Sequence, residues 1–167
     1  MSCLDDIKKC IHKSAEVEGD ARNYLEEKKT NTKVQIRTNG QYLLYDFEKV
    51  KPRLFTFFEN TKEVKGLNKI ADNVLFIEDN KGALWVFVIE LKQNNGMPDK
   101  QLYATKQFVL YLLNSINRAC KKDYKPNVRG IGYSKKCRPT TKPKYPYDSN
   151  KNAYVSGDKL ILSNYLI

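Results

Sequence analysis

Residues 72–92 constrain the fold of this chain more than any other stretch. They contain two apolar, strand-like runs separated by a polar turn at 80–82. Gly82 can take the positive φ that a three-residue hairpin loop requires, so the pattern predicts an antiparallel hairpin in which Asp79 faces Ala83. Apolar residues occupy both faces of both runs, which predicts strands that are buried on both sides.

The predicted register brings two carboxylates together. The numbers of facing residues in an antiparallel pair have a constant sum, so Asp72 lies opposite Glu90 and shares a face with Lys92. Facing carboxylates repel unless a cation lies between them or one of them is protonated. Mg²⁺ is a hard cation that carboxylates and water commonly hold. With the Leu91 carbonyl as a third ligand, the sequence predicts a Mg²⁺ or Mn²⁺ site at Asp72, Glu90 and Leu91.

Asp72 at the start of one strand and Glu90-Leu91-Lys92 at the end of the next resemble the active-site signature of the PD-(D/E)XK nuclease superfamily. Ala71 stands where that family usually has proline, at a position that carries no metal ligand. Gln101 matches a glutamine that family members often place near the metal and the phosphate, early in the following helix. The resemblance covers roughly residues 70–115.

The resemblance implies an α/β fold of the restriction-endonuclease type. We expect a single domain over residues 1–167, with a central mixed β-sheet flanked by helices. The resemblance also implies a metal-dependent nuclease that hydrolyses phosphodiester bonds of DNA or RNA, with Mg²⁺ or Mn²⁺ activating a water. The catalytic residues would be Asp72, Glu90, Lys92 and Gln101.

Two roles stay open within this prediction. Lys92 would stabilise the developing charge, orient the attacking water, or act in its neutral form as the base. Family members often use another acid from an upstream helix, and Glu48, Glu59 and Glu63 are the candidates, with Glu59 preferred because an apolar run precedes it.

Other interpretations fit the same residues. In the first, Asp72 and Glu90 lie at the solvated rim of a sheet, and Lys92 forms an ordinary salt bridge with one of them. In the second, the chain keeps a nuclease-like fold but binds nucleic acid or regulates without cleaving it. In the third, the chain is a toxin-type nuclease module that pairs with an inhibitor. Because all three residues are present, a fully decayed site is disfavoured.

The net charge of +11 predicts a polyanionic partner. Residues 118–151 hold 11 Lys or Arg against 2 Asp, with tyrosines and prolines between them, which suits phosphate contact and base stacking. The alternative for 137–147 is a solvated, Pro-rich loop. We expect nucleic acid as the partner, DNA before RNA, and no membrane; a homodimer or an acidic inhibitor protein stays open. The expected phosphate contacts are Lys121, Lys122, Arg129, Lys135, Lys136, Arg138, Lys142 and Lys144.

Histidine and cysteine chemistry is disfavoured by number and spacing. His12 is the only histidine, so a histidine zinc cluster is excluded and a Ser-His-Asp triad would depend on a residue in the predicted first helix. The cysteines, Cys3, Cys10, Cys120 and Cys137, show no C-x-x-C spacing, and no signal-peptide core is present. We therefore expect no disulfides and a reducing, cytoplasmic location. No apolar run is long enough to cross a bilayer.

The remaining pattern predicts the other elements. Residues 1–30 are expected to be a helical segment, with helices over 4–17 and 20–29. Strands over 34–37 and 41–47 flank Asn39-Gly40, a hairpin signal. The run 53–59 is ambiguous between helix and strand. The remaining predictions are a helix over 99–120 capped by Asp99, a strand over 128–133 and a final strand over 159–166.

Overall fold

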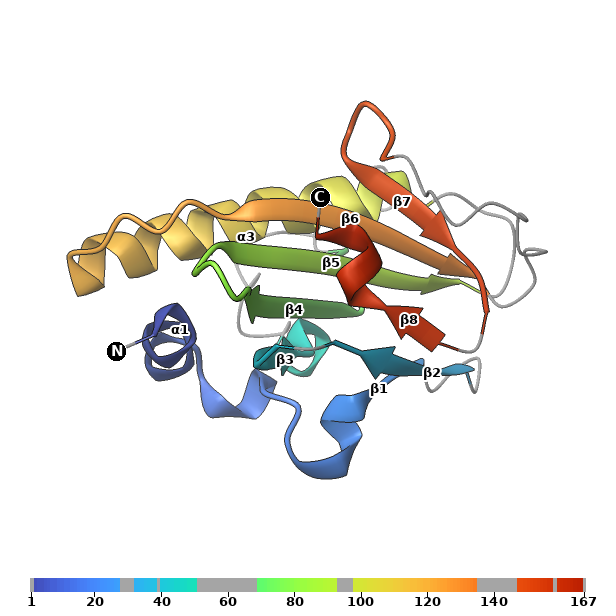
Figure 1. The fold of residues 1–167 in the computed structure, drawn as a ribbon, viewed down its shortest axis with the longest axis horizontal. Helices are drawn as coiled ribbons and strands as arrows, with labels where there is room; N and C mark the ends of the chain where they lie inside the picture. The colour runs from blue at the N-terminus through green and yellow to red at the C-terminus, as the bar shows by residue number, and fades with distance from the viewer. Residues whose placement is uncertain are drawn as a thin grey trace, which may run out of the picture.

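A five-stranded mixed sheet lies at the centre of the α/β fold (Figure 1). The computed structural model describes residues 2–27, 32–38, 40–50, 69–92, 98–134, 147–157 and 159–166. The strand order is β3-β4-β5-β6-β7, and β4 runs antiparallel to the other four strands. The strands are β3 (Tyr42–Tyr45), β4 (Asn73–Glu78), β5 (Leu84–Lys92), β6 (Asn127–Ser134) and β7 (Asn152–Val155). The prediction of an α/β fold with a central mixed sheet is confirmed.

Strands β4 and β5 form the predicted hairpin in the predicted register. Asn73 pairs with Ile89 at one end, and the Asp79 N–H donates to the Ala83 carbonyl at 3.0 Å at the other. Gly82 has a φ of +76°, which a residue with a Cβ rarely adopts. The turn chemistry therefore fixes the alignment of the two strands over their whole length.

The hairpin is buried on both faces, as its composition predicts. Val74 and Val88 belong to one apolar cluster, whereas Leu75 and Phe87 belong to a second cluster on the opposite face. Because side chains alternate along a strand, positions 72, 90 and 92 fall on the face of the first cluster.

Among the described residues, two helices cover the first face. They are α1 (Cys3–Cys10) and α3 (Asp99–Cys120), and α3 occupies the residues predicted for it. Leu102, Val109 and Leu113 recur at helical spacing and are fully or almost fully buried. Helix α3 contacts both β5 and β6, so it forms the crossover between two parallel strands (Figure 1). No helix among the described residues is long and apolar enough to cross a membrane.

A three-stranded sheet, rather than a helical layer, covers the second face within the described residues. Its order is β1-β2-β8, from β1 (Tyr24–Glu27), β2 (Thr32–Arg37) and β8 (Lys159–Ile161). Leu25 and Leu160 contribute to the second apolar cluster together with residues of β4 and β5. In the part of the chain that the structure describes, the expectation of a sheet flanked by helices therefore holds on one face only.

The predicted helical segment over 1–30 is wrong beyond its first helix. Helix α1 ends at Cys10, followed by the short 3-10 helices η1 (Lys13–Ala15) and η2 (Gly19–Asn23), and β1 then occupies part of the predicted second helix. Leu25 is fully buried and pairs with Val34. Burial against the second cluster outweighs the helix propensity of this Leu- and Glu-rich stretch.

The hairpin predicted at Asn39-Gly40 is also wrong. Strand β2 pairs with β1 and, in parallel, with the distant β8, whereas β3 pairs with β4. The two strands on either side of the turn thus belong to different sheets. The local turn signal carried no information about these long-range pairings.

Several smaller predictions change. Asp99 is not the cap of α3, because Pro98 precedes the helix and makes no side-chain cap hydrogen bond. The predicted strand 41–47 ends at Tyr45 and gives way to η3 (Phe47–Val50), and the final strand gives way to η4 (Leu162–Tyr165). Strand β7 was not predicted. The ambiguous run 53–59 lies outside the described residues.

Candidate active site

The open end of the β4–β5 hairpin holds the predicted acids side by side. The Asp72 N–H donates to Glu90 Oε2 at 3.2 Å, and the Leu91 N–H donates to Asp72 Oδ2 at 2.7 Å. Each carboxylate is thus bound by the backbone of the opposite strand. The N–H and C=O of one strand residue point to the same side, so the Leu91 carbonyl is turned toward Asp72.

Lys92 and Gln101 complete the group. Lys92 Nζ lies 2.5 Å from Glu90 Oε1 and donates to Gln101 Oε1 at 2.8 Å. Gln101 comes from the first turn of α3, so a hairpin and a helix meet at this point. The structure brings together Asp72, Glu90, Leu91, Lys92 and Gln101, as the sequence predicts.

Thr105 ties this helix turn to the start of β4. Its side chain is fully buried, its hydroxyl donates to the Gln101 carbonyl at 2.8 Å, and it accepts from the Ala71 N–H at 2.7 Å. The Thr105 hydroxyl therefore links Ala71, which precedes Asp72, to Gln101, which accepts the hydrogen bond from Lys92. Sequence reasoning missed Thr105, although a polar residue on the apolar face of the predicted helix was a usable signal.

Two glycines let neighbouring elements approach the site closely. Gly132 of β6 faces Glu90, and a Cβ on it would lie 2.8 Å from the Tyr154 ring and 2.9 Å from Pro98. A Cβ on Gly130 would meet Lys106 of α3 at 3.0 Å. The start of α3 can lie against β6 because these positions carry no side chain.

Burial dominates the electrostatics of Glu90. The residue is only 2% exposed, and desolvation raises the pKa of its carboxyl above the ordinary value, although Lys92 opposes this shift. A buried carboxylate is costly without a cation beside it. The Lys92 ammonium supplies that cation in this structure.

The donor set suits a hard divalent ion. Asp72, Glu90 and the Leu91 carbonyl offer oxygen ligands, and Mg²⁺ often takes one or two carboxylates, with water and substrate phosphate completing its shell. No group of three or more His, Cys, Asp or Glu side chains suited to a metal occurs within the described residues. The two acids and the carbonyl would hold the ion in an open site.

The turn end of the same hairpin carries two further acids in a different environment. Asp79 accepts from the Lys81 and Ala83 N–H groups at 2.9 Å each and from Trp85 Nε1 at 3.1 Å. Glu78 accepts from the Cys3 N–H at 3.1 Å. Hydrogen bonds from Ala83 first and then Trp85 hold the pKa of Asp79 below its ordinary value. Asp79 therefore stabilises the turn, and Glu78 caps the start of α1.

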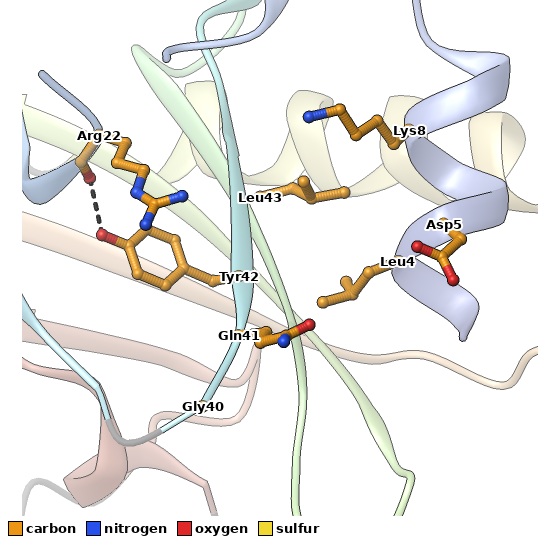
Figure 2. Close-up of a pocket in the computed structure, with 8 residues that line it drawn as sticks. All are labelled: Leu4, Asp5, Lys8, Arg22, Gly40, Gln41, Tyr42 and Leu43. Atoms are coloured by element: carbon orange, nitrogen blue, oxygen red, sulfur yellow. Dashed lines mark hydrogen bonds between the residues drawn. The ribbon is translucent and has the colours of Figure 1, made fainter. Parts of the chain in front are cut away.

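A hollow of about 490 Å³ lies away from this group, between α1 and β3 (Figure 2). Three of its polar side chains have structural partners: Asp5 closes the capping box of α1, Lys8 pairs with Glu16 at 2.9 Å, and the Tyr42 hydroxyl donates to the Arg22 carbonyl. The lining residues are Leu4, Asp5, Lys8, Arg22, Gly40, Gln41, Tyr42 and Leu43. None of the predicted site residues lines it.

Three of the predicted phosphate contacts, Lys121, Lys122 and Arg129, are among the described residues, and these three do not gather beside Glu90. Lys121 and Lys122 are exposed just after α3, about 30 Å along the helix from Gln101. The guanidinium carbon of Arg129 lies 5.2 Å from the centre of the Trp85 ring and 5.0 Å from the centre of the Tyr147 ring.

The other predicted contacts and two upstream acids lie outside the described residues. They are Lys135, Lys136, Arg138, Lys142, Lys144, Glu59 and Glu63. The third upstream acid, Glu48, is exposed on η3.

Comparison of the chain with family models, curated proteins and solved structures found no significant match.

Proposed function

We propose that this chain is a metal-dependent nuclease that hydrolyses phosphodiester bonds of nucleic acid at the open end of the β4–β5 hairpin. The observation that carries the proposal is the hydrogen-bonded group of Asp72, Glu90, Lys92 and Gln101 around the Leu91 backbone. The order of elements also supports it, because a hairpin, a crossing helix and a parallel strand follow one another as the resemblance implies. The net charge of +11 suits a polyanionic substrate.

The chain's own groups have distinct tasks in this proposal. Asp72 and Glu90 would hold Mg²⁺ or Mn²⁺, which when bound polarises a phosphate and lowers the pKa of a water. The backbone hydrogen bonds to the two carboxylates fix their orientation before substrate arrives. Thr105 is a positioning residue, because it acts only through Ala71 and Gln101.

Lys92 would meet the substrate in this proposal. Glu90 and Gln101 hold its Nζ from two sides, and its side chain is 33% exposed, so the amine is fixed yet reachable. In the ion-paired form it can donate to a phosphate oxygen and stabilise the charge that develops there. This favours charge stabilisation over the role of base among the alternatives for Lys92.

The test is cleavage of labelled single- and double-stranded DNA and RNA with Mg²⁺, Mn²⁺ or EDTA. Wild type should cut at least one substrate in a metal-dependent manner, and Glu90→Gln and Lys92→Met should not. Asp79→Asn is the matched control, because it neutralises an acid at the other end of the same hairpin and should keep activity.

Absence of metal-dependent cutting under every condition, combined with tight, salt-sensitive binding, would replace the proposal with a nucleic-acid-binding role. Equal cleavage by wild type and Glu90→Gln would exclude this site as the source of activity.

A further inference from the structure

The solvent face of α3 carries one continuous stripe of polar, aromatic and basic side chains. Its members recur every three or four residues, so the helical period places them on one side. The stripe comprises Lys100, Tyr103, Gln107, Tyr111, Asn114, Arg118 and, just past the helix, Lys121. All of these residues are exposed. No acid interrupts the stripe, since the one acid of α3 is Asp99, before its first member.

The two tyrosines of this α3 stripe are unusually open to solvent. Tyr103 is 65% exposed and Tyr111 is 72% exposed, the largest values among exposed large hydrophobic residues in the described part of the chain. Neither ring contributes to an apolar cluster of the core. Exposed aromatic rings without a folding role are typical of binding surfaces, because they offer an apolar face and a polar tip.

A hollow adjoins the first half of the α3 stripe. It measures about 440 Å³, within the usual range for a ligand pocket. Lys106 is fixed at its wall by hydrogen bonds to the Asn150 carbonyl at 2.7 Å and to Asn152 Oδ1 at 2.5 Å. The lining residues are Asp99, Lys100, Tyr103, Lys106, Gln107, Asn150 and Asn152. Amide and aromatic groups in one hollow suit a planar ring with hydrogen-bonding edges.

The α3 stripe leads away from the candidate active site. Tyr103 follows Gln101 by two residues, Tyr111 lies about 12 Å further along the axis, and Lys121 another 15 Å or so beyond. Because two residues correspond to about 200° of helical rotation, Gln101 and Tyr103 lie on different sides of α3, so a strand at Gln101 would have to pass around the start of the helix to reach the stripe. It would then meet a tyrosine, a second tyrosine and a basic end in order. The distance between Lys121 and Glu90, which is too long for one local site, fits such an extended ligand.

We propose that the α3 stripe binds a single-stranded segment of nucleic acid, with bases stacked on Tyr103 and Tyr111 and phosphates near Lys100, Arg118 and Lys121. A single strand is favoured because a duplex hides the base faces that stack on aromatic rings. Charge complementarity supports this occupant, because the stripe is basic and free of acids. The inference deepens the proposed function and rests on it, since the bound strand would be the substrate of the Asp72–Glu90 site.

The experiment measures binding in EDTA, so that it does not depend on cleavage. Fluorescence anisotropy compares a labelled single-stranded oligonucleotide with the matching duplex, for wild type and Tyr103→Ala/Tyr111→Ala. Wild type should prefer the single strand, and the double variant should lose about fivefold or more in affinity for each tyrosine. Tyr103→Phe/Tyr111→Phe should retain most of the affinity, because the rings remain.

Matched controls separate the stripe from the general charge of the protein. Ile161→Ala removes an exposed apolar side chain from β8 and should leave affinity unchanged. Lys121→Gln should reduce the slope of log affinity against log salt concentration by about one released counterion. The Lys13 side chain is 80% exposed on η1, away from the stripe, and Lys13→Gln should leave this slope unchanged. Thermal midpoints of all variants should match wild type, because the substituted side chains are exposed.

Unchanged single-strand affinity in the double alanine variant would overturn the inference. A wild-type dimer in solution that the same variant dissociates would also overturn it, because a second copy of the chain would then cover the stripe. Tyrosine-dependent binding without metal-dependent cleavage would instead overturn the nuclease proposal and leave the strand-binding surface in place.

Discussion

The two ends of the β4–β5 hairpin carry pairs of acids in opposite surroundings. At the turn, Asp79 accepts hydrogen bonds from the loop backbone and Trp85, which lowers the pKa of its carboxyl. At the open end, Glu90 is buried among packed elements, and desolvation raises the pKa of its carboxyl. The first acid stabilises the local backbone, whereas the second requires a cation when it is ionised. The environment alone thus shifts the pKa values of two acids of one hairpin in opposite directions.

Neutralising one acid at each end should give the largest contrast. Glu90→Gln is expected to lower the cleavage rate by more than about 100-fold. The loss of a residue that only supports a metal ligand costs up to about 100-fold, and the loss of a ligand itself should cost more. Asp79→Asn should leave the cleavage rate within a few-fold of wild type and lower the thermal midpoint. Single-turnover rates and thermal unfolding of both variants check this contrast; a comparable loss of activity in both would erase it.

Thr105→Val should damage the open end without touching a proposed ligand. The buried Ala71 N–H loses its acceptor, which should lower the free energy of unfolding by about 1–3 kcal/mol. Because Gln101 also loses its link to β4, cleavage should fall about 10- to 100-fold, as for other outer-shell partners.

Thr105→Ser keeps the hydroxyl but removes the buried methyl group. Relative to Thr105→Val, it should recover more of the cleavage rate than of the free energy of unfolding. Urea denaturation and initial rates, measured on the same samples, separate the two effects. Ser115→Ala removes a hydroxyl bound to the Tyr111 carbonyl elsewhere on α3 and should change neither quantity appreciably.

Each end of the hairpin depends on a glycine: Gly132 leaves space at the open end, and Gly82 adopts a positive φ at the turn. Substitution by alanine should affect the two ends differently. Gly132→Ala places a Cβ against Pro98 and Tyr154, so overpacking should cost about 1–3 kcal/mol of stability and slow cleavage by displacing the start of α3. Gly82→Ala meets open space but forces a positive φ, which should cost about 1–2 kcal/mol and leave cleavage unchanged. Denaturation and rate measurements on both variants test the pair; impaired cleavage in Gly82→Ala would contradict it.

The smallest expected contrast is in the pH dependence of stability, measured without metal. Since the pKa of Glu90 is raised in the folded state from 4.5, its contribution is full below that value and is lost as pH rises through the raised pKa. Since the pKa of Asp79 is lowered from 3.8, its contribution is present above that value and is lost as pH falls.

Unfolding free energies of wild type, Glu90→Gln and Asp79→Asn across acid and neutral pH should show these opposite slopes. Wild type should lose stability relative to Glu90→Gln as pH rises, and relative to Asp79→Asn as pH falls. Parallel curves for all three proteins would contradict the assignment of the two environments.

The sequence predicted the hairpin and its acids because the information there is local. The length of the turn and the positive φ of Gly82 determine the register without knowledge of any distant residue. Helix α3 was predictable for the same reason, because its buried residues recur at helical spacing within one continuous segment.

Contacts between distant segments were not predictable in this way. Strand β2 takes its parallel partner from β8, more than a hundred residues later, and β1 is a strand because Leu25 is buried against the central sheet. Nothing in the sequence distinguishes Gly132 from other strand glycines, because its importance comes from Pro98 and Tyr154, which lie against it in the fold. Such features depend on which elements meet in space, and a single sequence does not state that.

The three-residue turn at 80–82 has a consequence for how this protein can vary. The turn is exposed and distant from the acids along both strands, so it would ordinarily tolerate insertions and deletions. Here its length decides which residue stands opposite Asp72. A deletion that shifted the pairing by one position would exchange the two faces of a strand and send Glu90 to the side that now holds Leu91. Loop length at this turn is therefore under the same constraint as the identity of the acids, although no residue of the turn belongs to the site.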